Sequence, residues 1–298
     1  MEIDGVVHKF GFLDMNTDLP STRKTFVEAF KRMKTYADFQ NVRPLLEGCV
    51  RDRRKMTPGR YNQIIRDLAL NDCLPIAIDC ARAAERTGMK LNTSEIINDL
   101  LVCIQQPAIM SGFKAAKTRV ALQQVSTIVD MLETDENHKP TAETQGAFPF
   151  YRDPQVLAAR LHMAAAQAVY HQEGKDVDGK VAKYADELVK LWPEDAALLD
   201  LQPDAAYQDS NKMKYILGRA TYLWFASPVL NGLTLAAQVV DPGLAMQLQN
   251  RADAVEQEVK TAVAALDTAK DPAKTKRGER MYNVLFNNQA KAGDSEAA

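Results

Sequence analysis

The sequence predicts an all-α protein, in which an N-terminal helix-turn-helix repeat array is followed by a C-terminal helical domain. Three observations support this prediction. Apolar residues recur every three or four positions along most of the chain, which places them on one face of a helix. Almost no stretch alternates with period two, the pattern of a half-buried strand. Helix start and stop signals separate the periodic segments, and early in the chain these segments return at a fixed spacing.

The clearest repeat spans residues 59–93. Its first helix gathers four apolar residues on one face, namely Tyr61, Ile64, Ile65 and Leu68. A polar break follows, and Pro75 suits the first turn of a second helix, where the missing N–H of proline has no cost. Gly88 closes that second helix, because glycine adopts the left-handed conformation easily. A single hairpin of this kind cannot bury its apolar face alone, so neighbouring copies are expected.

Those copies lie one period of 35 residues away, where Phe26 and Ile96 take the position of Tyr61. This pattern resembles the pentatricopeptide repeat. The resemblance is good in 59–93, partial in 24–58, where Val42 and Arg53 replace a small residue and the glycine, and fades after about Gln105. The helix-turn-helix rhythm of Pro58 to Leu101 is also similar, more weakly, to that of the helical-repeat subunit Va of cytochrome c oxidase.

Changes in composition predict the domain boundaries. We expect an N-terminal extension over 1–20, a helical-repeat domain over 21–133, a linker over 134–152, a C-terminal helical domain over 153–287 and a disordered tail over 288–298. The linker is polar, contains Pro140 and Pro149, and shows no helical period. Two Asp-Pro pairs, at 153–154 and 241–242, predict an N-cap followed by proline at the first helical position.

The segment 220–240 stands apart because it contains no charged residue. Its length would let a single helix cross a bilayer, so membrane contact through 220–240 is one interpretation. Pro228, Asn231 and Gly232 make the segment only moderately apolar. They favour the other interpretation, a buried hairpin of two helices joined at Ser227-Pro228.

Charge and cysteine content narrow the class of protein. Lys and Arg total 37 against 39 Asp and Glu, so the chain has a formal net charge of −2 and lacks the overall basic excess of most nucleic-acid-binding proteins. The four cysteines all lie on apolar helical faces of the repeat region and form no CxxC pair; they are Cys49, Cys73, Cys80 and Cys103. We expect buried, reduced thiols.

No catalytic, cofactor-binding or metal-binding constellation is recognisable. The sequence has no GxxxxGK[ST], GxGxxG, GxSxG or HExxH motif. His162 and His171 would project to opposite sides of one helix, and His8 and His138 fall in predicted loops. We therefore predict that the protein is not an enzyme and binds no cofactor.

Two features bear on RNA. The run Arg51-Asp52-Arg53-Arg54-Lys55 could contact phosphate, although cations are also favourable at a helix C-terminus. Pentatricopeptide proteins read one RNA base per repeat with the fifth and last repeat residues. Here that resemblance assigns the positions Glu28 with Pro58, Gln63 with Thr93, and Asn98. Only Asn98 has the residue type usual in the family, which argues against base reading.

The resemblances therefore imply a non-catalytic accessory subunit that acts as a protein–protein scaffold. We expect it on the matrix side of a mitochondrial inner-membrane assembly, with a respiratory complex such as cytochrome c oxidase as the first choice and ATP synthase as the next. Its partners would be other subunits of that complex. The alternative is an organellar RNA-binding pentatricopeptide protein, which acts in RNA processing or in the mitoribosome.

Overall fold

The structure is a computed structural model that describes residues 2–3, 6–7, 22–54, 56–266 and 272–287. It confirms the all-α prediction: helices dominate, and the strands of the described residues are β1 (Glu2–Ile3) and β2 (Val6–Val7), a short antiparallel pair with Ile3 opposite Val6. Most of the predicted extension over 1–20 lies outside the described residues, and so does the whole predicted tail over 288–298.

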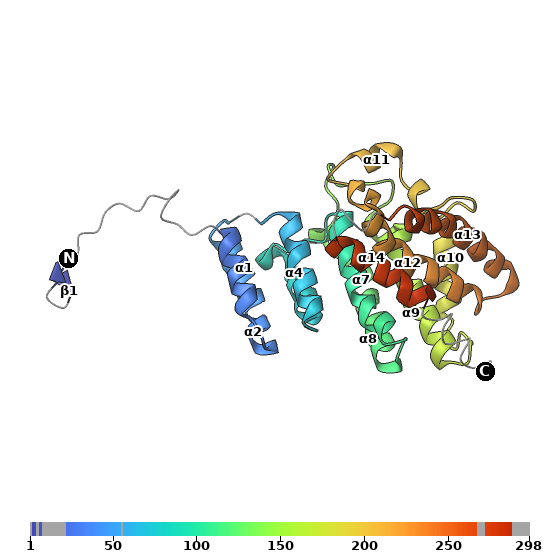
Figure 1. Cartoon of the computed structure of the whole chain (residues 1–298), viewed down its shortest axis with the longest axis horizontal. Coiled ribbons are helices and arrows are strands. Elements are labelled where there is room, and N and C mark those ends of the chain that lie inside the picture. The colour runs from blue at the N-terminus through green and yellow to red at the C-terminus, as the bar shows by residue number, and fades with distance from the viewer. Residues whose placement is uncertain (1, 4–5, 8–21, 55, 267–271, 288–298) are drawn as a thin grey trace.

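The first half of the chain forms a stack of helical hairpins, and Figure 1 shows them side by side from the N-terminal end inward. In each hairpin, a first helix is followed in the chain by one or two helices that run back in the opposite direction. The helices are α1 (Thr22–Arg32), α2 (Tyr36–Gln40), α3 (Val42–Arg51), α4 (Pro58–Leu70), α5 (Leu74–Arg82), α6 (Ala84–Thr87), α7 (Ser94–Met110) and α8 (Ala115–Thr134). Neighbouring hairpins pack through α3 on α6 and α4 on α7.

The signals at the two ends of the 59–93 repeat have the predicted roles, but its predicted second helix is divided at Ala83 into α5 and α6. All four apolar residues of its first helix are buried, and Gly88 ends α6 with φ +70°. The hydroxyl of Tyr61 donates to the carbonyl of Thr87 at 3.3 Å, and a Cβ at Gly88 would lie 2.5 Å from that hydroxyl. Arg53, one period earlier, is also left-handed, with φ +55°. The period of 35 residues is therefore a period of backbone conformation as well as of sequence.

The second half of the chain is a bundle around α12. Two short helices lead into it, η1 (Glu136–His138) and η2 (Phe150–Arg152). The remaining elements are α9 (Pro154–His171), α10 (Lys180–Val189), η3 (Leu198–Asp200), α11 (Asp204–Gln208), η4 (Lys214–Leu217), α12 (Arg219–Ala237), α13 (Pro242–Ala264), α14 (Pro272–Tyr282) and η5 (Asn283–Asn287). Asp153 and Asp241 accept hydrogen bonds from backbone N–H groups of α9 and α13, so both predicted N-caps are confirmed.

The predicted pair of helices at Ser227-Pro228 is wrong, because α12 continues through Pro228 as a single helix. Proline removes one backbone N–H, and here the surrounding packing outweighs that loss. α9, α13 and α14 all pack against α12, which is why its residues are apolar all round. Among the described helices, none combines the length and the apolarity needed to cross a membrane.

One hydrophobic core runs through both halves. α8 packs on α9, and α7 packs on α9 and α12. A polar network also crosses this boundary: Asn98 of α7 donates to Gln155 of α9 at 2.9 Å, and the His162 ring bridges Gln105 of α7 and Asn231 of α12 at 2.8 and 2.9 Å. The division at 134–152 stays a prediction, and within that segment His138 is fully buried.

Candidate nucleic-acid interface

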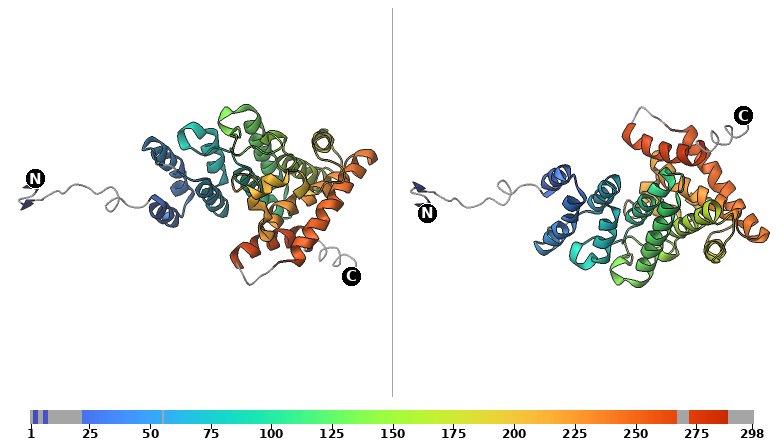
Figure 2. Two further views of the ribbon diagram at one scale, coloured as in Figure 1. Left: turned by 90° about the horizontal axis from the view of Figure 1, so that it is seen from above. Right: turned by 90° about the horizontal axis from the view of Figure 1, so that it is seen from below.

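Positive charge is concentrated at the N-terminal end of the hairpin stack. Residues 21–60 contain eleven Lys and Arg against four Asp and Glu, a net charge of +7, whereas the rest of the chain contains 26 against 35, a net charge of −9. Figures 1 and 2 place this segment at one end of the helical body in all three views. The whole-chain balance of −2 conceals the difference, and a charge count in a sliding window would have found it.

Seven basic side chains of this segment are exposed, and we call them the α1–α3 surface. They are Lys24, Lys31, Arg32, Lys34, Arg51, Arg53 and Arg54. They come from α1, from the turn before α2 and from the end of α3. Because long cationic side chains at exposed positions remain hydrated and able to reach outward, this surface suits a polyanion.

Three of the four acids of this segment have local partners that limit their effect on the α1–α3 surface. Asp38 accepts hydrogen bonds from the backbone N–H groups of Lys34 and Thr35 at 2.9 Å, which lowers its pKa and fixes it as part of a capping box. Glu47 lies between Arg43 at 3.1 Å and Arg86 at 2.8 Å. Asp52 lies 3.7 Å from Arg51.

α3 ends at Arg51, and the backbone of the next residues closes the helix. The backbone N–H of Arg54 donates to the carbonyl of Cys49 at 2.8 Å, and that of Arg53 donates to Val50 at 3.0 Å, which closes the helix with Arg53 in the left-handed region. A non-glycine residue in that region costs about 1–2 kcal/mol. Glycine holds the equivalent place at Gly88, so Arg53 carries a charge where the backbone would be more stable with glycine.

The positions that the pentatricopeptide resemblance assigned to base reading do not form one open surface. Glu28 and Pro58 are exposed, and Gln63 accepts a hydrogen bond from Arg60 at 2.7 Å. Thr93 is the N-cap of α7, where it accepts from Ile96 N–H, and is almost buried. Asn98 is buried in the network with Gln155. The side chains of Thr93 and Asn98 therefore serve the fold.

The histidines and cysteines that the structure describes have structural environments, and His8 lies outside the described residues. His162 is fully buried, which lowers its pKa to about 4, and His171 contacts the carbonyl of Phe113 at 2.6 Å. His138 accepts from the N–H of Leu91 at 3.0 Å. All four cysteines are free and buried, which confirms that prediction. Within the described ranges, no three His, Cys, Asp or Glu side chains could hold a metal ion together.

Comparison with known proteins gives consistent matches. The family model of mitochondrial ribosomal protein mS27 matches residues 1–284. The small ribosomal subunit protein mS27 of Neurospora crassa is 38% identical over 304 residues, which cover 96% of this chain and 75% of the relative.

These matches correct the first functional expectation. A subunit of a respiratory complex or of ATP synthase at the inner membrane is wrong, because the matching family and relative are ribosomal, and the mitoribosome alternative is the better supported one. The likeness to pentatricopeptide proteins and to subunit Va is not supported by these matches. A ribosomal family agrees with a non-catalytic role, although the absence of any activity stays a prediction. With a match over 284 consecutive residues, the chain belongs to the family of mitochondrial ribosomal protein mS27.

Proposed function

We propose that this chain is a structural component of the small subunit of the mitochondrial ribosome, in the matrix, and that the α1–α3 surface binds phosphates of ribosomal RNA. The observation that supports this most is the net charge of +7 over residues 21–60. Each Lys or Arg that neutralises a phosphate releases condensed counterions, which favours binding whatever the base sequence.

Contacts to the RNA backbone fit this surface better than base reading. Its polar groups are flexible cations, which position a protein on RNA without specifying sequence. Tyr36, at the start of α2, is 52% exposed and lies two residues after Lys34. Its ring offers a surface on which an unpaired base could stack. In this proposal the hairpin stack positions the basic side chains of the α1–α3 surface for contact with RNA phosphates.

The remainder of the chain suits protein neighbours. Its net charge of −9 disfavours approach to RNA, and its helices share one continuous core. We propose that residues 21–133, as the repeat part, present the RNA-binding end, that 134–152 connect the two parts, and that residues 153–287 contact other proteins of the subunit. In this arrangement the chain links RNA to protein.

Binding to fragments of the small-subunit ribosomal RNA at several salt concentrations tests the proposal. One variant replaces Lys31, Arg32 and Lys34 with glutamine, and a matched control replaces Lys175, Lys183 and Lys190, which are exposed on or near α10. Loss of three phosphate contacts should make the slope of log K against log salt less steep by about two to three. The control should keep the wild-type slope. Equal slopes for both variants would exclude the α1–α3 surface as the RNA contact.

A further inference from the structure

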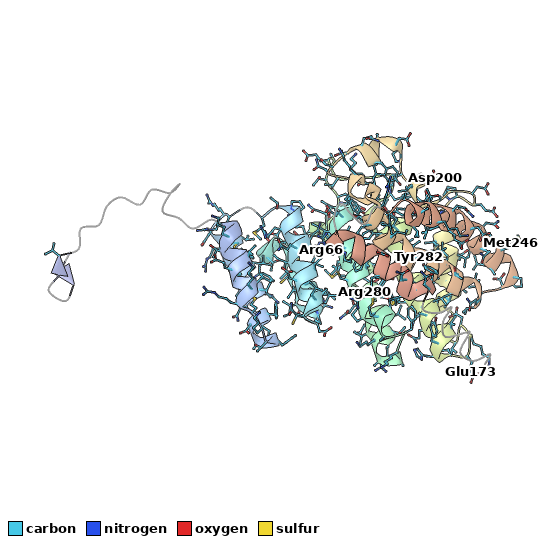
Figure 3. All side chains as sticks on the ribbon, in the orientation of Figure 1. Arg66, Glu173, Asp200, Met246, Arg280 and Tyr282 are labelled. Carbon is cyan, nitrogen blue, oxygen red and sulfur yellow. The ribbon has the colours of Figure 1, made fainter. Side chains whose placement is uncertain are left out.

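A groove crosses the face formed by α4, α7, α8 and α14. It consists of a pocket of about 290 Å³ and a pocket of about 260 Å³, which share Ala69 and Cys103 as lining residues. Figure 3 shows Arg66 of α4 and Arg280 of α14, which line the second pocket, near each other. We call the two pockets together the α4–α14 groove. It is separate from the α1–α3 surface, since it shares no residue with it.

The groove offers exposed apolar surface. Leu70, at the end of α4, is 78% exposed and lines the second pocket; Val120, on α8, is 48% exposed and lines the first. Large apolar side chains gathered at one concave site on a protein surface indicate a binding site. Pro107 of α7 also lines the first pocket. Because proline has no backbone N–H, it cannot make the helical hydrogen bond to the carbonyl of Cys103 one turn earlier.

Arginines line the second pocket. The buried carboxylate of Asp99 accepts from Arg66 Nε at 2.8 Å and lies 3.8 Å from Arg277, whose guanidinium stacks on the Trp224 ring at 4.3 Å. Arg280 is exposed beside them, and the structure shows no acidic partner for it among the described residues. Three arginines against two carboxylates, those of Asp99 and of Glu95 at 3.9 Å from Arg66, leave this pocket with one net positive charge.

Two buried polar atoms next to these arginines also lack partners. Among the described residues, neither the indole N–H of Trp224 nor the Oδ1 atom of Asp99 has a hydrogen bond. Buried polar groups are normally satisfied, so each such atom requires an explanation. Because one of these atoms is a donor, the other is an acceptor and both are buried, the preference of the second pocket for an anionic ligand rests on its arginines. The first pocket, in contrast, is close to neutral, with Asp72 and Lys117 both at its lining.

We propose that the α4–α14 groove binds a segment of a neighbouring protein that combines apolar side chains with Asp or Glu. The apolar side chains would cover Leu70 and Val120, and a carboxylate would pair with Arg280, since arginine binds carboxylates through two parallel hydrogen bonds. RNA fits this groove less well, because phosphates would lie against leucine and valine. Trp224 is only 2% exposed and cannot stack on a base.

This inference rests on the proposed place of the chain in the small ribosomal subunit, and photo-crosslinking inside the assembled subunit tests it. A photoreactive amino acid replaces Leu70, and a control carries it at Met246, which is 62% exposed on α13. Co-sedimentation confirms that both variants enter the subunit. The expected result is a crosslink from position 70 to one protein segment that contains apolar and acidic residues. A crosslink to RNA, a crosslink to a basic segment, or no crosslink in subunits that contain the variant would overturn the inference.

Binding of that segment as a synthetic peptide gives a second measurement. R280E and L70E should each weaken binding at least tenfold, whereas K183E on α10 should leave it unchanged. R280E should also leave the salt dependence of RNA binding at its wild-type slope, so a failure of the groove is distinguishable from a failure of the α1–α3 surface. Equal peptide affinity for R280E and wild type would refute the role of the arginine.

Discussion

Gly278 provides the sharpest test of how α14 is held. A Cβ atom at this position would lie 2.1 Å from the carbonyl oxygen of Ala220, a backbone atom of α12 that cannot rotate away. G278A should therefore push α14 off α12. Overpacking of this kind costs about 1–3 kcal/mol. The free-energy cost of displacing α14 cannot exceed what the burial of Met281 and Leu285 contributes. Both side chains are at most 1% exposed, and their burial contributes roughly 3–6 kcal/mol in total.

Hydrogen exchange of residues 277–287, together with chemical denaturation, measures this effect. In G278A these amides should exchange faster by ten- to a hundredfold, because each 1.4 kcal/mol corresponds to a factor of ten. The matched control is G48A, since a Cβ at Gly48 in α3 meets nothing within 4 Å and should stabilise the helix by about 0.5–1 kcal/mol. Wild-type exchange rates in G278A would refute the close packing of α14 on α12.

Three further predictions concern the repeats and the buried core. G88A should destabilise the protein by at least about 1–2 kcal/mol in urea denaturation, because of its positive φ. Y61F/G88A should recover part of that loss by removing the hydroxyl in the way, and strictly additive effects would contradict the contact. R53G should leave the unfolding midpoint unchanged or higher, yet reduce the salt slope of RNA binding by about one; a lower midpoint would contradict the strain at this position. Burial raises the pKa of Asp153 to about 6 and lowers that of His162 to about 4. Asp153 therefore favours folding at low pH and loses that contribution as pH rises through 6, whereas His162 loses its contribution as pH falls below 6.5. Between pH 4 and 6 the two slopes oppose each other, so D153N should become more stable with rising pH and H162Q less stable, each by up to about 1.4 kcal/mol per pH unit. Parallel stability profiles for the two variants would contradict these pKa shifts.

Local signals in the sequence were sufficient for many elements. Asp153 and Asp241 accept bonds from N–H groups two or three residues away, and Gly88 ends a helix through its own backbone angle. Such interactions depend on neighbours in the chain, so a reader of the sequence can predict them. The apolar face of α4 and the burial of the four cysteines follow from helical periodicity for the same reason.

Function was harder to predict from the same signals. The hairpin pattern led to a membrane-associated scaffold, because any stack of helical hairpins needs the same apolar periodicity whatever it binds. The whole-chain net charge of −2 then argued against RNA binding, although residues 21–60 alone carry a net charge of +7. The relevant quantity was the charge at one end of the stack, which depends on where that segment lies in space.

The sequence by itself determined the Asp153 and Asp241 caps, the helix end at Gly88 and the apolar faces of the 35-residue repeat, because those depend on contacts within a few residues. Only the tertiary structure decided that α12 passes through Pro228, since packing by three other helices outweighs one missing hydrogen bond. It also decided that Asp99 would meet Arg277, 178 positions later, beside Trp224. Such long-range encounters depend on how whole helices pack, and no local pattern in the chain specifies them.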